Sequence, residues 1–235
     1  MTAVDPLVLS SLGTELLDDP AADPRAVARS LRNIARSNRW FGGAAAVRHG
    51  LRRALTGVPA GTTLTFVDLG TGLGDLPQVA ARWADRRGLE LIPVGLERSP
   101  VAARLAHRGG LPCVVGCAGA PPFRDKSVDV VLVSQVAHHL TDTSAMRLFR
   151  ACDRLARRAV IVSDLRRGLL GPVAFWVGAR VLRFDEITRT DGITSLRRGY
   201  TARQLRDLLA AAGIRGTVDR RPGYRLVAVW RGGGI

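Results

Sequence analysis

The sequence predicts an α/β fold in which helices cover both faces of a mostly parallel sheet of seven strands whose last strand is antiparallel. Three observations support this prediction. From residue 62 onward, apolar runs of strand length alternate with amphipathic segments, as in repeated β-α-β units. A glycine-rich turn follows the first apolar run. The two closing strands are joined at Pro222-Gly223 by a turn so tight that they must be antiparallel.

Residues 1–60 are expected to form an N-terminal helical cap. Val27, Leu31 and Ile34 recur at helical spacing and define one apolar stripe. A second stripe of the same helix carries five arginines, namely Arg25, Arg29, Arg32, Arg36 and Arg39. Such a row is usually a solvated face, although it could also bind phosphates. Gly42-Gly43 ends this helix, and residues 58–61 lead into the first strand.

Residues 61–235 are expected to form the main domain. The seven strands are predicted at residues 64–69, 89–96, 112–116, 128–134, 159–163, 214–219 and 224–230. Helices are predicted at residues 76–87, after Ser99, at 143–157 and at 201–213. Ser99 is a good N-cap, and Thr201 with Gln204 forms a capping box for the helix that ends at Gly213.

The alternation of strands and helices lapses between Asp164 and Gly199. This segment contains an apolar amphipathic helix at residues 169–182 and a polar loop at residues 185–198. It follows the fifth strand, at the carboxyl edge of the sheet, where open α/β sheets bind their ligands. We expect a lid insertion over the substrate at about residues 165–199. A dimer interface or a plain surface insertion is the alternative.

The composition is that of a globular protein of 235 residues, long enough for one domain or one domain with a small addition. The formal net charge is +15, and Lys126 is the only lysine. Such basicity favours nucleic acid as a partner, but the arginines are spread over the whole chain, which favours a compositional bias. Cys113, Cys117 and Cys152 form no Cys-x-x-Cys pair, so neither a disulfide framework nor a metal site is expected. No signal peptide or membrane-spanning run is evident, so we expect a cytoplasmic protein without stable membrane insertion.

The glycine-rich turn carries the strongest functional signal. An apolar strand ends in Asp68, and Gly70, Gly72 and Gly74 follow at alternate positions. Asp75 stands where a dinucleotide-binding turn needs a third small residue, and neither Lys nor Ser/Thr follows Gly74 as a phosphate-binding P-loop requires. The turn brings the backbone close to a nucleoside cofactor, but its pattern is neither that of a dinucleotide-binding turn nor that of a P-loop.

This run resembles the first motif of the class I S-adenosylmethionine (SAM)-dependent methyltransferases, whose Rossmann-like fold has the predicted strand arrangement. Residues 115–123 and 127–134 resemble the third and fourth motifs, with Cys117 in the place of the usual aspartate. Residues 134–140 resemble a stretch of the ubiquinone/menaquinone-type and related small-molecule enzymes. Residues 33–43 and 190–200 are similar to a bacterial subgroup that often accompanies polyketide or quinone-type biosynthesis.

The resemblance implies SAM as cofactor, S-adenosyl-L-homocysteine (SAH) as product and no metal. Glu97 ends the second strand, where an acid can accept hydrogen bonds from both ribose hydroxyls. The cofactor-binding residues that the resemblance implies are Asp68, Gly70, Thr71, Gly72, Gly74, Glu97, Arg98, Cys117, Ala118, Gly119, Ser134 and Gln135. His138 and His139 are the candidate catalytic bases, although both could be structural. Asp191 and Arg197 are candidates for substrate contact.

Three functions follow from these observations. The first is O-methylation of a phenolic, quinol or polyketide-like small molecule by a monomer or homodimer. The second is RNA methylation, which the charge and the arginine stripe favour. The third is a non-catalytic module that keeps the fold and binds a partner, which the replacement at Cys117 favours. The chain lacks the Asn/Asp-Pro-Pro-aromatic motif of amino-methylating enzymes, which argues against methylation of DNA bases.

Overall fold

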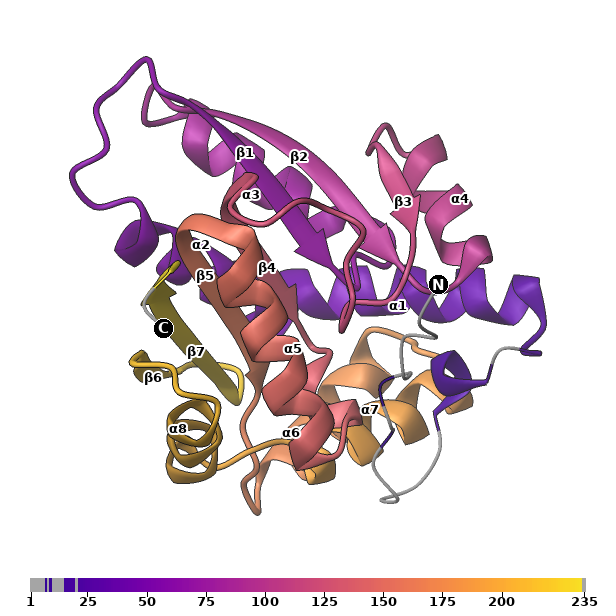
Figure 1. Cartoon of the computed structure of the whole chain (residues 1–235). Helices are drawn as coiled ribbons and strands as arrows, with labels where there is room; N and C mark the ends of the chain where they lie inside the picture. The colour runs from indigo at the N-terminus through magenta and orange to yellow at the C-terminus, as the bar shows by residue number, and fades with distance from the viewer. Residues whose placement is uncertain (1–6, 8, 10–14, 20, 234–235) are drawn as a thin grey trace.

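A computed structural model of the chain describes residues 7, 9, 15–19 and 21–233 (Figure 1). A seven-stranded sheet has the strand order β3-β2-β1-β4-β5-β7-β6. The strands are β1 (Thr63–Leu69), β2 (Glu90–Glu97), β3 (Cys113–Val115), β4 (Val128–Ser134), β5 (Ala156–Leu165), β6 (Thr217–Arg221) and β7 (Arg225–Arg231). The first five strands pair in parallel, whereas β7 is antiparallel to both β5 and β6. The predicted fold class is therefore confirmed.

Eight α-helices are present in the described part of the chain, together with two short 3₁₀ helices. The α-helices are α1 (Pro24–Trp40), α2 (Gly43–Ala54), α3 (Asp75–Asp85), α4 (Pro100–Arg108), α5 (Asp142–Leu155), α6 (Gly171–Val181), α7 (Glu186–Arg198) and α8 (Ala202–Ala211). The 3₁₀ helices are η1 (Leu16–Asp18) and η2 (Ala137–His139). In the described residues, no helix has the length and apolar character needed to cross a membrane.

The sheet separates two hydrophobic cores, because successive side chains of a strand point to opposite faces. Val67 of β1 packs in a core with Phe149 of α5 and Leu205 of α8. The neighbouring Phe66 packs in a second core with Leu51 of α2. In Figure 1, α5 lies in front of the sheet, and α2 and α3 lie behind it. Helices thus cover both faces, as predicted.

Helix α2 lies within the expected N-terminal cap but packs directly on the sheet. Val47 and Leu51 are fully buried. Gly50 lies so close to β5 that a Cβ atom there would collide with Cγ2 of Ile161. This residue therefore sets the distance between the helix and the sheet.

Substitution of Gly50 by valine is expected to lower the free energy of unfolding by about 1–3 kcal/mol, because the added methyl groups overpack this contact. Urea denaturation measures the change. The matched control is Arg48→Val, which places the same side chain on the exposed face of α2 and is expected to cost about 0.5 kcal/mol or less. Equal losses in the two variants would show that the Gly50 contact is not tight.

The predicted polar loop at residues 185–198 is wrong, because these residues form helix α7. Their apolar side chains show too little periodicity to indicate a helix. Asp185 supplies the missing signal: its side chain caps the helix by accepting a hydrogen bond from the Thr188 backbone N–H at 2.9 Å. It also accepts a 2.7 Å bond from the Asn33 side chain of α1. Capping and tertiary contact thus stabilise a helix that the apolar pattern does not reveal.

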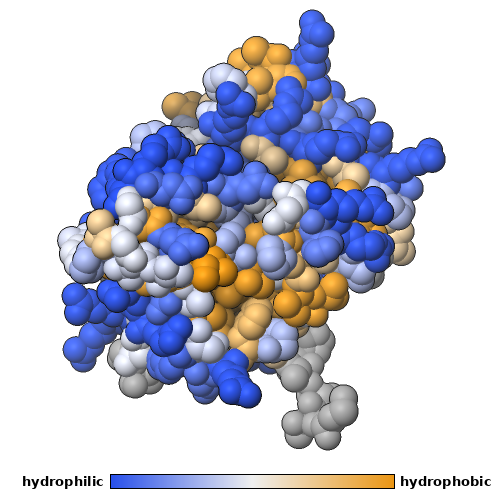
Figure 2. All heavy atoms as spheres, turned by 90° about the horizontal axis from the view of Figure 1, so that it is seen from above, coloured by the Kyte–Doolittle hydropathy of each residue, from blue (hydrophilic) through white to orange (hydrophobic). Residues whose placement is uncertain are grey.

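The apolar stripe and the arginine stripe of α1 occupy different faces. Val27 and Leu31 are buried, whereas all five arginines of the predicted stripe are exposed. One of them, Arg36, also donates a 2.6 Å hydrogen bond to the Leu182 carbonyl beyond α6. Hydrophilic side chains also surround an apolar area on the face of the molecule seen in Figure 2.

Candidate functional site

The glycine-rich turn lies at the carboxyl end of β1. Gly70, Gly72 and Gly74 have φ angles of +82°, +56° and +76°, a region that glycine adopts without strain. A Cβ atom at Gly70 would lie only 2.5 Å from Cγ2 of Val136. The turn therefore needs glycine both for its backbone conformation and for its close approach to the loop after β4.

Two acids hold this turn in place. Asp68 is buried and accepts a 2.9 Å hydrogen bond from the Thr71 hydroxyl, and burial raises the pKa of its carboxyl to about 8. Glu97, at the end of β2, accepts hydrogen bonds from the backbone N–H groups of Gly72 and Ser99, both at 3.0 Å. Glu97 therefore connects the glycine turn to the start of α4.

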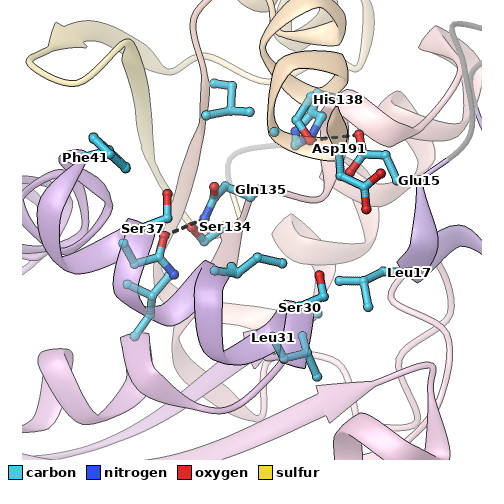
Figure 3. A pocket seen from close by; sticks show the side chains of 18 of the residues that line it. Glu15, Leu17, Ser30, Leu31, Ser37, Phe41, Ser134, Gln135, His138 and Asp191 are labelled. Atoms are coloured by element: carbon cyan, nitrogen blue, oxygen red, sulfur yellow. Dashed lines mark hydrogen bonds between the residues drawn. The ribbon is translucent and has the colours of Figure 1, made fainter. Parts of the chain in front are cut away.

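A pocket of about 420 Å³ opens beside the turn, at the carboxyl edge of the sheet. Ten of the residues predicted from the sequence line it: Asp68, Gly70, Thr71, Gly72, Glu97, Ser134, Gln135, His138, His139 and Asp191. In Figure 3, His138, Glu15 and Asp191 lie together on one side of the pocket, and Ser37 and Phe41 lie on the other. The structure thus brings most of the predicted residues into one cavity.

Six predicted residues lie outside the lining of this pocket: Gly74, Arg98, Cys117, Ala118, Gly119 and Arg197. Gly74 packs against Leu111, where an added Cβ would lie 2.7 Å from the leucine side chain. Gly119 is covered in the same way by Leu7, with a distance of 2.6 Å. Arg197 is exposed on α7. Leu7 therefore covers Gly119, one of the three residues at positions 117–119 that the resemblance assigns to cofactor binding.

Helix α1 contributes pocket residues that the sequence interpretation missed. Ser30, Leu31 and Asn38 line the cavity. The Asn38 side chain donates to Asp75 at 3.0 Å and accepts from the Gln135 amide at 2.7 Å. The signal for Asn38 was available, because it is a polar residue within the segment that resembles the bacterial subgroup.

His138 forms a buried pair with Asp164. Parallel pairing of β4 with β5 sets Ser134 opposite Ser163, so Asp164, near the end of β5, lies close to the residues that follow β4. His138 Nδ1 lies 2.6 Å from Asp164 Oδ1, and the His138 backbone N–H donates to Asp164 Oδ2 at 3.2 Å. Burial alone would raise the pKa of Asp164, but His138 and the Leu165 N–H lower it below its ordinary value.

The contact with Asp164 fixes the proton of the imidazole on Nδ1, because a carboxylate only accepts. Nε2 is then the acceptor, and it has no hydrogen-bond partner among the described residues. The His138 side chain is 1% exposed, so water does not supply that partner freely. Asp164 escaped prediction because an acid at a strand end carries no local signal for its partner, which lies in η2 after the neighbouring strand.

His139 belongs to a second, charged cluster. Its Nδ1 lies 3.1 Å from Asp18 Oδ1 and 3.0 Å from Arg198 Nη1. One nitrogen cannot both donate to the acid and accept from the guanidinium, and we assign the proton to Nδ1 because the carboxylate needs a donor. Arg198 also bonds Glu15 at 3.1 Å and Asp18 at 3.2 Å. Although burial alone would raise the pKa of Asp18, His139 and Arg198 lower it.

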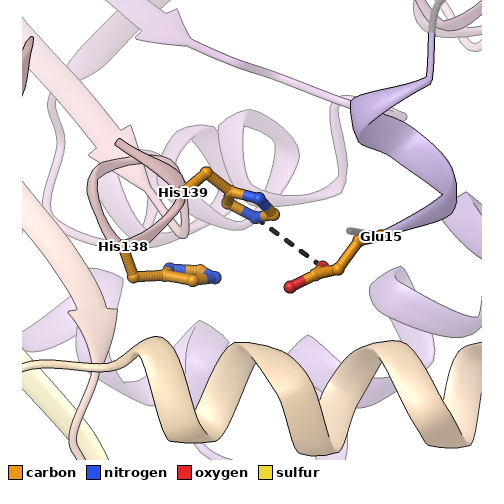
Figure 4. A group of neighbouring side chains, drawn as sticks. All are labelled: Glu15, His138 and His139. Carbon is orange, nitrogen blue, oxygen red and sulfur yellow. Dashed lines mark ion pairs between the residues drawn. The ribbon is translucent and has the colours of Figure 1, made fainter. Parts of the chain in front are cut away.

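Glu15 and Asp191 complete this side of the pocket. Burial raises the pKa of both carboxyls. Figure 4 shows the Glu15 carboxylate facing the two imidazoles. One ligand atom from each of Glu15, His138 and His139 lies within 4.8 Å of the others, so this group has the chemistry to hold a divalent cation. Without a cation, His138 Nε2 is an available proton acceptor beside the glycine turn.

Comparison with known proteins gives one family and many structures. Residues 67–162 match the family model described as "Methyltransferase domain". No curated protein sequence matches the chain significantly. Among solved structures, the plantazolicin methyltransferase with SAH aligns with a TM-score of 0.66 and 12% identity, over 92% of this chain and 93% of that one. A SAM-dependent methyltransferase from Aquifex aeolicus aligns with a TM-score of 0.59 and 14% identity, over 89% and 98%.

A third structure is an O-methyltransferase from neocarzinostatin biosynthesis, solved with SAH and 1,4-dihydroxy-2-naphthoic acid. It aligns with a TM-score of 0.64 and 20% identity, over 92% of this chain and 61% of that one. Because the sequence identities are this low, the three structural alignments establish a shared fold and nothing more.

Proposed function

We propose that this chain, which carries a class I SAM-dependent methyltransferase domain, is an O-methyltransferase of a phenolic, quinol or polyketide-like small molecule. The observation that carries the proposal is the buried His138–Asp164 pair, whose free Nε2 lies in the same pocket as the glycine turn. A hydroxyl acceptor must lose a proton as it is methylated, and a neutral imidazole suits that role.

The residues beside the pocket fit the cofactor. The glycine turn lets the backbone approach a nucleoside closely. From the end of β2, one Glu97 oxygen accepts from Gly72 of the turn and the other accepts from Ser99 before α4. Ser134 and Gln135 supply polar groups at the end of β4. The adenine would bind along residues 117–119, where it would replace Leu7. When bound, SAM supplies an electrophilic methyl group on a sulfonium, and the protein supplies alignment.

His138 and Asp164 have different roles in the deprotonation of the acceptor hydroxyl. Nε2 of His138 accepts the proton of the acceptor hydroxyl as the oxygen forms its new bond to carbon. Asp164 keeps the other imidazole proton on Nδ1 and stabilises the imidazolium that results. Because both groups are buried, they keep one orientation and exclude water from the reacting atoms.

The rest of the pocket favours a flat apolar acceptor. Phe41, Leu165 and Phe175 form an apolar wall, and Asp191 offers one polar contact. Arg197 lies outside the wall, so we propose substrate contact for Asp191 alone. The O-methyltransferase from neocarzinostatin biosynthesis binds 1,4-dihydroxy-2-naphthoic acid, a flat aromatic compound with hydroxyl groups, which supports the proposal.

A second candidate is RNA methylation, which the exposed arginines of α1 favour. Arg25, Arg29 and Arg32 lie on the helix that also lines the pocket with Leu31. Salt-sensitive RNA binding at this face would be its signature.

Both candidates are tested by incubating the protein with methyl-labelled SAM, a lysate of its source and, separately, a panel of phenols that includes 1,4-dihydroxy-2-naphthoic acid. We expect label in the organic extract, at a rate that EDTA leaves unchanged, because His138 acts as a base without a metal. Label that precipitates with acid and is released by ribonuclease would establish RNA methylation. Activity lost to EDTA and restored by Zn²⁺ would assign Glu15, His138 and His139 to a cation.

A further inference from the structure

Helix α6 presents apolar side chains on two sides. Gly171, Ala174 and Phe175 line the pocket. The outward side carries Val173, Trp176, Val177 and Val181, and we name these four residues, together with Leu169 and Leu170 of the turn before the helix, the α6 stripe. Leu169 is 97% exposed and Val181 is 76% exposed. Within α6, spacings of one, three and four residues place Val173, Trp176, Val177 and Val181 on one face. So many large exposed apolar side chains indicate a binding surface.

The α6 stripe has a basic rim. From Arg166 to Arg183 the chain contains four arginines and no acid, and three of these arginines are exposed: Arg167, Arg180 and Arg183. The guanidinium carbon of Arg180 lies 4.5 Å above the ring of Trp176, so this arginine reaches along the stripe with its charge outward. At the end of the helix, Arg36 of α1 donates to the Leu182 carbonyl at 2.6 Å, which adds a further positive charge.

The apolar stripe and its arginine rim together distinguish between two binding partners, a second copy of this chain and a lipid bilayer. In a twofold dimer the same surface meets itself, so the arginine rims of two copies would oppose each other. An anionic bilayer surface instead accepts the apolar side chains between its headgroups and neutralises the arginines. We propose that the α6 stripe docks the protein on the surface of an anionic lipid bilayer.

The docked orientation has a consequence for the substrate, which rests on the proposed function. The stripe and the pocket wall lie on different sides of one helix, because Phe175 lies in the pocket and its neighbour Trp176 lies on the stripe. A docked protein would therefore hold its pocket one helix away from the lipid surface. An apolar phenol or quinol dissolved in the bilayer is the acceptor that this arrangement serves.

The test is flotation of the full chain with vesicles of phosphatidylcholine alone and with vesicles that contain phosphatidylglycerol. We expect binding to the anionic vesicles, weaker binding at high salt and little binding to the neutral ones. Val173→Asp/Val177→Asp and, separately, Arg180→Glu/Arg183→Glu are each expected to lower the vesicle-bound partition coefficient about tenfold or more. Circular dichroism checks that each variant is folded.

Matched controls place the same substitutions elsewhere on the exposed surface. The control variants are Val115→Asp, on β3, and Arg203→Glu/Arg206→Glu, on α8. Both are expected to bind anionic vesicles as well as the unmodified protein does. Binding that ignores lipid charge, or that all variants lose equally, would overturn the proposal. So would a dimer in sedimentation that Val173→Asp dissociates. Vesicle binding is measured without turnover, so its failure is distinguishable from failure of the proposed methyl transfer.

Discussion

Substitution of His138 by glutamine is expected to lower kcat by about 10²–10⁴-fold, the usual contribution of general base catalysis. Glutamine is close to histidine in size but cannot accept a proton at this position. His138 lines the pocket, its Nδ1 lies 2.6 Å from Asp164 Oδ1, and its buried Nε2 has no hydrogen-bond partner among the described residues. Transfer of labelled methyl from SAM to a phenol measures the effect, and calorimetric titration with SAM should show nearly unchanged affinity.

Two further variants distinguish the role of His138 as the base from the roles of the residues around it. Asp164→Asn should also lower kcat strongly, because the amide can donate to Nδ1 and so favour the wrong imidazole tautomer. His139→Gln should lower kcat less than His138→Gln does. The Nδ1 atom of His139 contacts Asp18 and Arg198, so His139 belongs to the charged cluster and is not the proposed base. Equal losses for His138→Gln and His139→Gln would contradict the assignment. A loss of SAM binding in His138→Gln would mean that this residue serves the cofactor.

Substitution of Glu97 by glutamine is expected to weaken SAM binding about 10–100-fold, because hydrogen bonds to a charged group contribute about 1.5–3 kcal/mol. The carboxylate of Glu97 accepts two backbone N–H bonds, from Gly72 and Ser99, and is placed to accept from the ribose hydroxyls. The amide nitrogen of glutamine can only donate, so one of these acceptor positions is lost. Titration of the protein with SAM measures the change.

The matched control for this prediction is Glu90→Gln at the other end of the same strand. The Glu90 side chain accepts from the Thr63 hydroxyl at 2.8 Å, is exposed and lies outside the pocket lining. Its substitution should leave SAM affinity within error. If both variants bind SAM equally well, Glu97 only braces the turn and the ribose is held by other residues.

The central strands could be predicted from the sequence because β1, β4, β5 and β7 are apolar runs that end at turns or helix caps with characteristic residues. The capping box of Thr201 and Gln204 is confirmed by bonds of 2.9 and 3.1 Å. The glycine turn was identifiable because only glycine tolerates its backbone angles. In each of these cases, the residues that determine the local structure lie within a few positions of it in the sequence.

The features that were missed depend on contacts between distant parts of the chain. Helix α7 relies on Asn33, far away in sequence, for part of its support. Asp164 meets His138 only through the register of β4 and β5. Leu7 covers Gly119 from the N-terminal segment, which no local pattern indicates. The sequence therefore predicts the position of the pocket better than the partners of its side chains.

The strand order has a consequence for biosynthesis on the ribosome. β7 is made after β6 but lies between β5 and β6, so the edge of β5 remains without its neighbour until β7 has emerged. Val160 and Val162 of β5 are fully buried in the finished sheet and pair with Trp230 and Ala228. Until then, the nascent chain presents an apolar strand edge of the kind that promotes aggregation. Chaperone demand should therefore be greatest while α6 to β6 are being translated.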